Sequence, residues 1–139
     1  MQDEVANEFI LSINKDTSLE ELHAYVSAKN ASNTALLLGI YTKSDLEHIG
    51  NIKLEPIISG LEATVGILIG EQNWRGKGVG FEVLSRIIQF SFNDLELTLL
   101  RLGIDRDNTA AYNLYRKLGF QDEVNNQSFS NTFEMTLKK

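Results

Sequence analysis

The segment from Trp74 to Gly80 reads W-R-G-K-G-V-G, which is a composition suited to holding an anion. Its glycines leave successive backbone N–H groups unobstructed and accept the positive φ that a concave nest of amides requires. Arg75 and Lys77 add charge-assisted donors. An apolar run precedes the segment and an amphipathic pattern follows it, so the N-terminus of a helix adds the positive end of its dipole. The expected chemistry is binding of a pyrophosphate.

Two familiar nucleotide-binding motifs do not fit this loop. A P-loop requires Gly-Lys-Ser or Gly-Lys-Thr, and neither occurs in the sequence. A dinucleotide fingerprint starting at Gly76 would have its third glycine at Phe81, and only Asp105 favours such a site. A tight strand-to-helix turn that binds nothing is the remaining alternative.

A second chemical feature lies downstream, in D-R-D-N-T-A-A-Y-N-L-Y-R-K-L-G-F from Asp105 to Phe120. Asn108 is suited to cap a helix, and Gly119 is suited to end it in the left-handed conformation. The spacing gives this helix one apolar face, made of Ala111, Leu114, Tyr115 and Leu118. A phenol on that inward face can donate a proton, although an ordinary packed tyrosine is the alternative.

In sequence order, R-x-x-G-x-G from Arg75 to Gly80 and N-x-x-A-x-x-x-Y-x-x-x-G-F from Asn108 to Phe120 resemble the GNAT superfamily of acetyl-CoA-dependent N-acetyltransferases. The longer run from Ile69 to Gly80 is most similar to the branch of ribosomal-protein-alanine, spermidine and amino-sugar acetyltransferases. The resemblance implies transfer of the acetyl group of acetyl-CoA, a cosubstrate, to a primary amine by direct attack. It also implies that Tyr115 is the general acid for the leaving thiolate.

The resemblance further implies a set of cofactor-binding residues. Backbone amides of Ile67, Leu68 and Ile69, where their strand splays from its neighbour, would hold the pantetheine arm and polarise the thioester oxygen. Asn108 would contact the pantetheine or a catalytic water, and Tyr115 would lie beside them. The pyrophosphate would lie on the loop residues Arg75, Gly76, Lys77, Gly78, Val79 and Gly80.

Attack on the thioester requires an unprotonated amine, and an alkylamine with a pKa near 10.4 is almost wholly protonated at neutral pH. Glu71, at the strand end beside the loop, is the candidate base that we assign. Glu62, Asp105 and His48 are alternatives, and a relay of waters needs no dedicated base. Each of these side chains is also consistent with a purely structural or solvated role.

The elements that must position these residues follow from periodicity and turn signals. Helices are expected from Thr17 or Ser18 to Ala28, from Val79 to Phe92, and from Asn108 to Leu118. Strands are expected at 35–42, 47–57, 62–70, 97–104, 120–124 and 132–137. The order predicts an α/β (α+β) fold with a mixed central sheet, in which antiparallel strands lead into a β-α-β crossover, with flanking helices and a C-terminal hairpin.

The expected organisation is one N-acetyltransferase domain over residues 1–139, with a family-like region from about 17 to 139. GNAT chains usually begin with a strand and a helix, and Met1 to Asp16 is short for both, so a shortened N-terminus is expected. A missing first strand would leave a sheet edge that a second copy of the chain, in a homodimer, can cover.

Composition narrows the partners. The net charge of −6 argues against nucleic acid, favours a cationic amine, and leaves anion binding to local cations such as Arg75, Lys77, Arg116 and Lys117. The chain has no cysteine and only two histidines, so no metal site is expected. Neither a leader nor a membrane span is evident, which predicts a cytoplasmic protein acting on a small-molecule or peptide amine. A non-catalytic acyl-CoA sensor and a nucleotide-binding module are the alternative classes.

Overall fold

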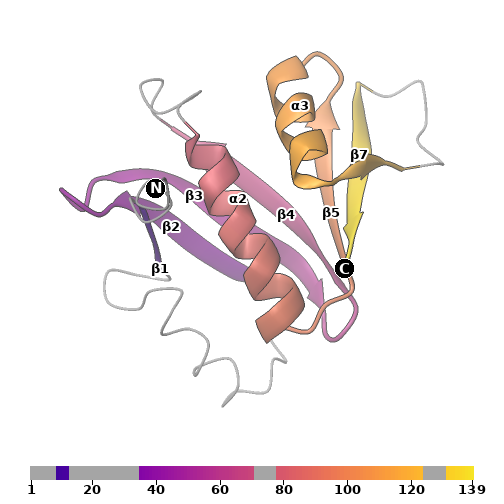
Figure 1. Cartoon of the computed structure of the whole chain (residues 1–139), viewed down its shortest axis with the longest axis horizontal. Coiled ribbons are helices and arrows are strands. Elements are labelled where there is room, and N and C mark those ends of the chain that lie inside the picture. Colours follow the sequence, from indigo (N-terminus) through magenta and orange to yellow (C-terminus); the bar gives the residue numbers. More distant parts are fainter. Residues whose placement is uncertain (1–8, 13–34, 71–77, 124–130) are drawn as a thin grey trace.

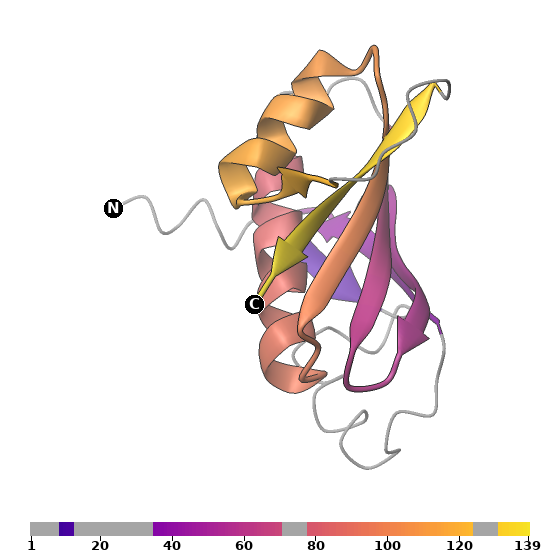
Figure 2. The same cartoon turned by 90° about the vertical axis from the view of Figure 1, so that its right-hand side faces the viewer.

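The computed structural model describes residues 9–12, 35–70, 78–123 and 131–139. These residues form a seven-stranded sheet in the order β1-β2-β3-β4-β5-β7-β6 (Figure 1). The helices α2 (Val79–Gln89) and α3 (Thr109–Leu118) lie on the same side of the sheet in the edge-on view (Figure 2). The helix predicted between Thr17 and Ala28 lies outside the described residues. No helix in the described part of the chain has the length and apolar character needed to cross a bilayer.

The first four strands form an antiparallel meander, as predicted for three of them. They are β1 (Phe9–Ser12), β2 (Leu36–Thr42), β3 (His48–Ile58) and β4 (Glu62–Ile69). The ends of β2, β3 and β4 lie within one residue of the predicted ends, because turn residues mark a boundary less sharply than a core position does. The meander ends with β4, shortly before the predicted anion-binding segment that begins at Trp74.

Strand β1 corrects the expectation of a missing first strand. It pairs with β2 from Phe9 beside Thr42 to Ser12 beside Gly39, and it covers the edge of β2 that a homodimer was expected to cover. Leu11 is fully buried, as is its cross-strand partner Ile40. Four residues are enough for this contact, yet they are too few to give a readable alternation in sequence.

The crossover from β4 to β5 (Leu99–Asp105) runs through α2, and the two strands are parallel as predicted. The helix predicted to end near Phe92 continues as the wider turn η3 (Phe90–Asp94), in which the Leu95 N–H donates to the Phe90 carbonyl at 3.1 Å. This five-residue spacing is that of a π-helix, and the apolar spacing of the sequence does not reveal it.

Strands β4 and β5 separate part-way along. Their pairing starts at Glu62 beside Leu99 and ends at Val65 beside Leu102, although both strands continue beyond that point. The far end of β4 is therefore paired with β3 on one side and leaves β5 on the other. Figure 1 shows the two strands diverging toward α3.

The C-terminal hairpin is confirmed in a shorter form. It consists of β6 (Gln121–Asp122) and β7 (Thr132–Lys138), and β7 also pairs antiparallel with β5 over that strand's whole length. Buried side chains of β5 alternate with outward ones, so Leu100 and Leu102 point into the core while Arg101 lies on the opposite face.

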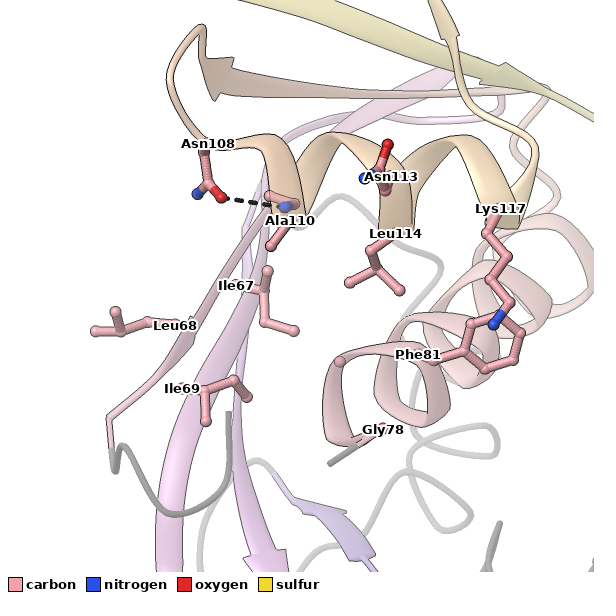
Figure 3. A pocket seen from close by; sticks show the side chains of 12 residues that line it. Ile67, Leu68, Ile69, Gly78, Phe81, Asn108, Ala110, Asn113, Leu114 and Lys117 are labelled. Atoms are coloured by element: carbon pink, nitrogen blue, oxygen red, sulfur yellow. Dashed lines mark hydrogen bonds between the residues drawn. The ribbon is translucent and has the colours of Figure 1, made fainter. Parts of the chain in front are cut away.

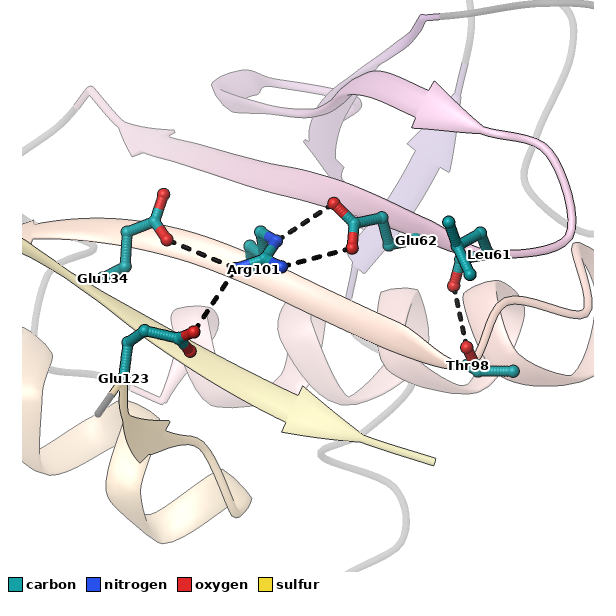
Figure 4. A network of polar contacts seen from close by, with 6 residues as sticks. All are labelled: Leu61, Glu62, Thr98, Arg101, Glu123 and Glu134. Carbon is teal, nitrogen blue, oxygen red and sulfur yellow. Dashed lines mark hydrogen bonds and ion pairs between the residues drawn. The ribbon is translucent and has the colours of Figure 1, made fainter. Parts of the chain in front are cut away.

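Arg101 joins three strands on that opposite face (Figure 4). Its Nε and Nη2 donate to the two oxygens of Glu62 on β4, at 3.0 and 3.3 Å. Its Nη1 donates to Glu134 on β7 at 3.4 Å and lies 3.8 Å from Glu123. The bidentate contact with Glu62 is the strongest of these, and it raises the pKa of the guanidinium.

Candidate active site

A pocket of about 700 Å³ opens where β4 and β5 separate (Figure 3). It lies between β4, the first turn of α2 and one side of α3. This volume is in the range of small-molecule and cofactor sites. The lining residues are Ile67, Leu68 and Ile69 from β4, Gly78, Gly80 and Phe81 at the start of α2, and Asn108, Ala110, Ala111, Asn113, Leu114 and Lys117 from α3.

The structure brings together six of the residues predicted to bind the cofactor: Ile67, Leu68, Ile69, Gly78, Gly80 and Asn108. The side chain of Val79, also predicted, is buried in the core and does not line the pocket. Glu71, Arg75, Gly76 and Lys77 lie outside the described residues. The six residues lie at the end of β4, at the start of α2 and at the N-cap of α3.

The first turn of α2 offers backbone donors to this pocket. Gly78 has φ +84° and makes no side-chain cap, and the first helical hydrogen bond runs from the Glu82 N–H to the Gly78 carbonyl at 3.0 Å. The N–H groups of Val79, Gly80 and Phe81 therefore precede that of Glu82, the first N–H with an acceptor inside the helix. Such amides, together with the helix dipole, favour an anion.

Two glycines shape the pocket by close approach. A Cβ on Gly80 would lie 3.1 Å from Leu114 Cδ2, so the missing side chain lets α2 approach α3 closely. A Cβ on Gly50 of β3 would lie 2.3 Å from the Leu68 carbonyl oxygen, which no real Cβ tolerates. Sequence reasoning missed Gly50. The signal was a glycine inside a strand pattern, which often marks a close backbone approach.

Asn108 has the predicted capping role. Its Oδ1 accepts a hydrogen bond from the Ala111 N–H at 3.0 Å, and its side chain also lines the pocket (Figure 3). The cap occupies the carboxamide oxygen, so the carboxamide nitrogen retains its two donors for a ligand. Asn108 therefore combines helix capping with a polar contact at one end of the pocket.

Tyr115 follows the lining residue Leu114 on α3, and it is itself in the core and not among the lining residues. The residue is 8% exposed, and its ring centroid is 6.0 Å from that of Phe120. Its carbonyl accepts from the Phe120 N–H at 2.9 Å, while the Gly119 N–H donates to the Arg116 carbonyl at 3.0 Å. These two bonds form the Schellman motif that ends α3, with Gly119 at φ +108°.

Burial raises the pKa of the Tyr115 phenol. Among the residues that the structure describes, none forms a hydrogen bond with its hydroxyl. The phenol is therefore protonated at neutral pH and retains its proton to higher pH than a tyrosine in water.

The described alternatives for the base do not reach the pocket. Glu62 is held by Arg101 on the opposite sheet face, and Asp105 is exposed at the end of β5. The His48 ring is stacked on Tyr41 at 5.0 Å, and its Nε2 is 3.0 Å from Asn51 Oδ1. No base is thus found among the pocket residues that the structure describes, and Glu71 stays a prediction.

Comparison with models of protein families identifies the family of this chain. A model described as "Acetyltransferase (GNAT) domain" matches residues 1–121. The chain belongs to the GNAT acetyltransferase family. The family resemblance inferred from the two sequence motifs is confirmed. The match begins at residue 1, whereas the motifs predict a family-like region that begins near Thr17.

Curated relatives of this GNAT chain are also acetyltransferases by name. An "N-acetyltransferase 9-like protein" of Caenorhabditis briggsae is 36% identical over 76 residues, which cover 53% of this chain and 36% of the relative. The "Probable N-acetyltransferase YjcK" of Bacillus subtilis is 30% identical over 87 residues, covering 61% of this chain and 48% of the relative. The chain matches between about a third and a half of the length of these relatives.

Solved structures confirm the GNAT fold. The spermidine N-acetyltransferase of Vibrio cholerae, in complex with CoA and spermine, has a TM-score of 0.68 at 22% identity and covers 86% of this chain and 74% of its own. The Campylobacter jejuni N-acetyltransferase PseH, in complex with acetyl coenzyme A, has a TM-score of 0.64 at 20% identity, covering 86% and 78%. At these identities the likeness concerns the fold.

Proposed function

We propose that this GNAT chain transfers the acetyl group of acetyl-CoA to a primary amine. The observation that carries the proposal is the pocket at the divergence of β4 and β5, with uncapped amides of α2 at one end and Asn108 at the other. A long ligand with an anionic part and a neutral, amide-containing arm suits this arrangement. Family membership and the ligands named for the two neighbouring structures support acetyl-CoA.

In the proposed complex, the pyrophosphate lies at the N-terminus of α2, with the loop residues Arg75, Gly76 and Lys77 adding donors and charge. The pantetheine arm runs along the end of β4. The backbone around Ile67, which faces away from β3 toward the diverging β5, polarises the thioester oxygen. Asn108 donates to the arm through its carboxamide nitrogen.

The amine attacks the thioester carbon, the C–S bond breaks, and the thiolate takes a proton. We propose Tyr115 as the proton donor and Glu71, or a water that it orients, as the acceptor of the amine proton. A phenol with a pKa of about 10 transfers a proton to a thiolate of pKa about 8.5 at a cost of roughly 2 kcal/mol, and burial adds to that cost. Tyr115 therefore acts by hydrogen bonding to sulfur as its charge develops, with transfer late in the step.

Tyr115→Phe tests this role. The variant keeps the ring that packs on Phe120, so we expect turnover to fall by 10- to 100-fold with acetyl-CoA affinity unchanged. Single-turnover CoA release and the dissociation constant, measured on both proteins, separate the two effects. An unchanged rate would exclude Tyr115 as the acid.

The acceptor is proposed only as a class. The negative net charge favours a cationic small molecule or peptide amine, and the neighbouring V. cholerae enzyme is named for spermidine. A non-catalytic acyl-CoA sensor would bind the cosubstrate without turning over any amine.

The function is tested in two stages. Thermal unfolding with acetyl-CoA, CoA, NAD and ATP in parallel identifies the ligand class, because a ligand that binds only the folded state raises the midpoint. We expect a rise with acetyl-CoA and CoA alone. CoA release over a panel of polyamines, amino sugars and peptide N-termini then separates an enzyme from a sensor. A rise with NAD or ATP alone would contradict the proposal.

A further inference from the structure

The side chain of Lys117 lies at the edge of the pocket, over an aromatic ring. The ammonium of Lys117, in the last turn of α3, lies 5.2 Å from the centroid of the Phe81 ring in the first turn of α2. Both residues line the pocket (Figure 3). Phe81 is 39% exposed, so its ring is accessible to the ammonium and to a ligand. The ring and the ammonium hold each other in place through a cation–π contact.

Among the described residues that line the pocket, Lys117 is the one with a charged side chain. The other eleven residues that line the pocket are apolar, glycine or asparagine. No carboxylate of the described residues pairs with Lys117, although the chain as a whole carries a charge of −6. A cation without a counter-charge at the edge of a mostly apolar pocket favours an anionic ligand group.

The pocket has two chemically different ends. Asn108 and the end of β4 lie at one, and Phe81, Gly78 and Lys117 lie at the other (Figure 3). Helix α3 runs between them. The nine residue-to-residue steps from Asn108 to Lys117, at about 1.5 Å each, span roughly 13 Å. With the pantetheine arm at the Asn108 end, the nucleotide end of the cosubstrate lies toward Lys117.

The nucleotide end of acetyl-CoA carries three phosphate groups. The amides at the start of α2 suit the pyrophosphate, which accounts for two of them. Lys117 belongs to a different helix, α3, and its ammonium lies over the Phe81 ring. We propose that Lys117, positioned by Phe81, binds the ribose 3′-phosphate and makes the pocket selective for CoA over its 3′-dephospho form. This inference rests on the proposed function.

The test compares two ligands that differ by this one phosphate. Isothermal titration of CoA and 3′-dephospho-CoA, at one fixed salt concentration, is carried out on the wild type, Lys117→Gln, Phe81→Leu and Lys43→Gln. Lys43, between β2 and β3, is the matched control, because it undergoes the same substitution, is exposed, and does not line the pocket. Circular dichroism and thermal unfolding without ligand show whether each variant folds.

We expect Lys117→Gln to weaken CoA binding roughly tenfold and to leave 3′-dephospho-CoA within twofold of the wild type. Phe81→Leu weakens CoA binding less, because the charge remains without its positioning ring. Lys43→Gln leaves both ligands within twofold.

Equal weakening of both ligands by Lys117→Gln would place the ammonium on the pyrophosphate and overturn the inference. So would unchanged binding of both. If the wild type binds neither ligand, acetyl-CoA is not the cosubstrate, and the proposed function fails before any variant is compared.

Discussion

Burial determines how Tyr115 titrates, and this has a measurable effect on stability. Its pKa is raised in the folded protein relative to about 10 in the unfolded chain, so between the two values the folded state binds more protons. The free energy of unfolding therefore falls as pH rises above about 10. Tyr115→Phe cannot lose stability by this route.

Urea unfolding of the wild type and Tyr115→Phe from pH 8 to pH 11 measures the difference. The other tyrosines titrate in both proteins, so they cancel in the comparison. We expect a constant difference below pH 10 and a relative loss in the wild type above it. Parallel curves over the whole range would mean that the phenol is as well solvated as in water.

Gly50 of β3 lies so close to the backbone of β4 at Leu68 that no side chain fits at this position. Gly50→Ala would bring a Cβ to within 2.3 Å of the Leu68 carbonyl, so the backbone of β3 or β4 must move. We expect a loss of about 1–3 kcal/mol in the free energy of unfolding and weaker acetyl-CoA binding. Gly103→Ala on β5 is the control, because its Cβ would meet no atom within 4 Å. Chemical unfolding and ligand titration are the measurements, and equal behaviour of the two variants would contradict the expectation.

At the scale of elements, helix α3 carries two functions that substitution at Asn108 can separate. Asn108→Ser keeps an oxygen for the Ala111 N–H and should preserve stability, whereas Asn108→Ala should lose about 1 kcal/mol. Both remove the carboxamide nitrogen, so both should weaken acetyl-CoA binding. Thermal unfolding and titration of the two variants check this. Full affinity in Asn108→Ser would restrict Asn108 to capping.

The same helix shows why some elements could be predicted from sequence. The cap at Asn108, the apolar face and the stop at Gly119 are local signals, and the structure has all three. Strand β1 depends on pairing with β2, more than twenty residues away, and the turn η3 depends on a five-residue spacing. Neither leaves a local pattern.

Part of the candidate site could likewise be predicted from the sequence. Main-chain positions at the end of β4 and at Gly78 and Gly80 follow from motifs. Packing inside the pocket does not: Gly50 and Phe81 act through distant partners, Leu68 and Lys117. For the base, sequence offers carboxylates, and Glu62 shows that such a group can serve an ion pair on the far face of the sheet.

At the scale of the whole molecule, Arg101 on β5 connects this strand to β4 and β7 through its ion pairs with Glu62 and Glu134. Arg101→Gln leaves Glu62, Glu123 and Glu134 near one another without this cation, so we expect lower stability at pH 7. Salt screens a partly exposed ion pair, so the difference from the wild type should shrink at about 1 M salt.

Lys53→Gln, which removes a loose exposed ion pair with Glu55 at 3.9 Å, is the control and should stay within about 0.5 kcal/mol. Urea unfolding at low and at high salt, both at pH 7, gives the comparison. An equal deficit for Arg101→Gln at the two salt concentrations would show that the arginine contributes packing and little charge.

The early end of the ladder between β4 and β5 has a consequence for native-state dynamics. In the described residues, the pairing between the β1–β4 part and the β5–β7–β6 part consists of four registered positions, Glu62–Val65 against Leu99–Leu102. Two cooperative unfolding units joined by so short a ladder can open separately. A ligand lying in the divergence contacts β4 on one side and α3, the helix between β5 and β6, on the other. Amide hydrogen exchange should therefore report different opening free energies for the two parts without acetyl-CoA and one shared value when it is bound.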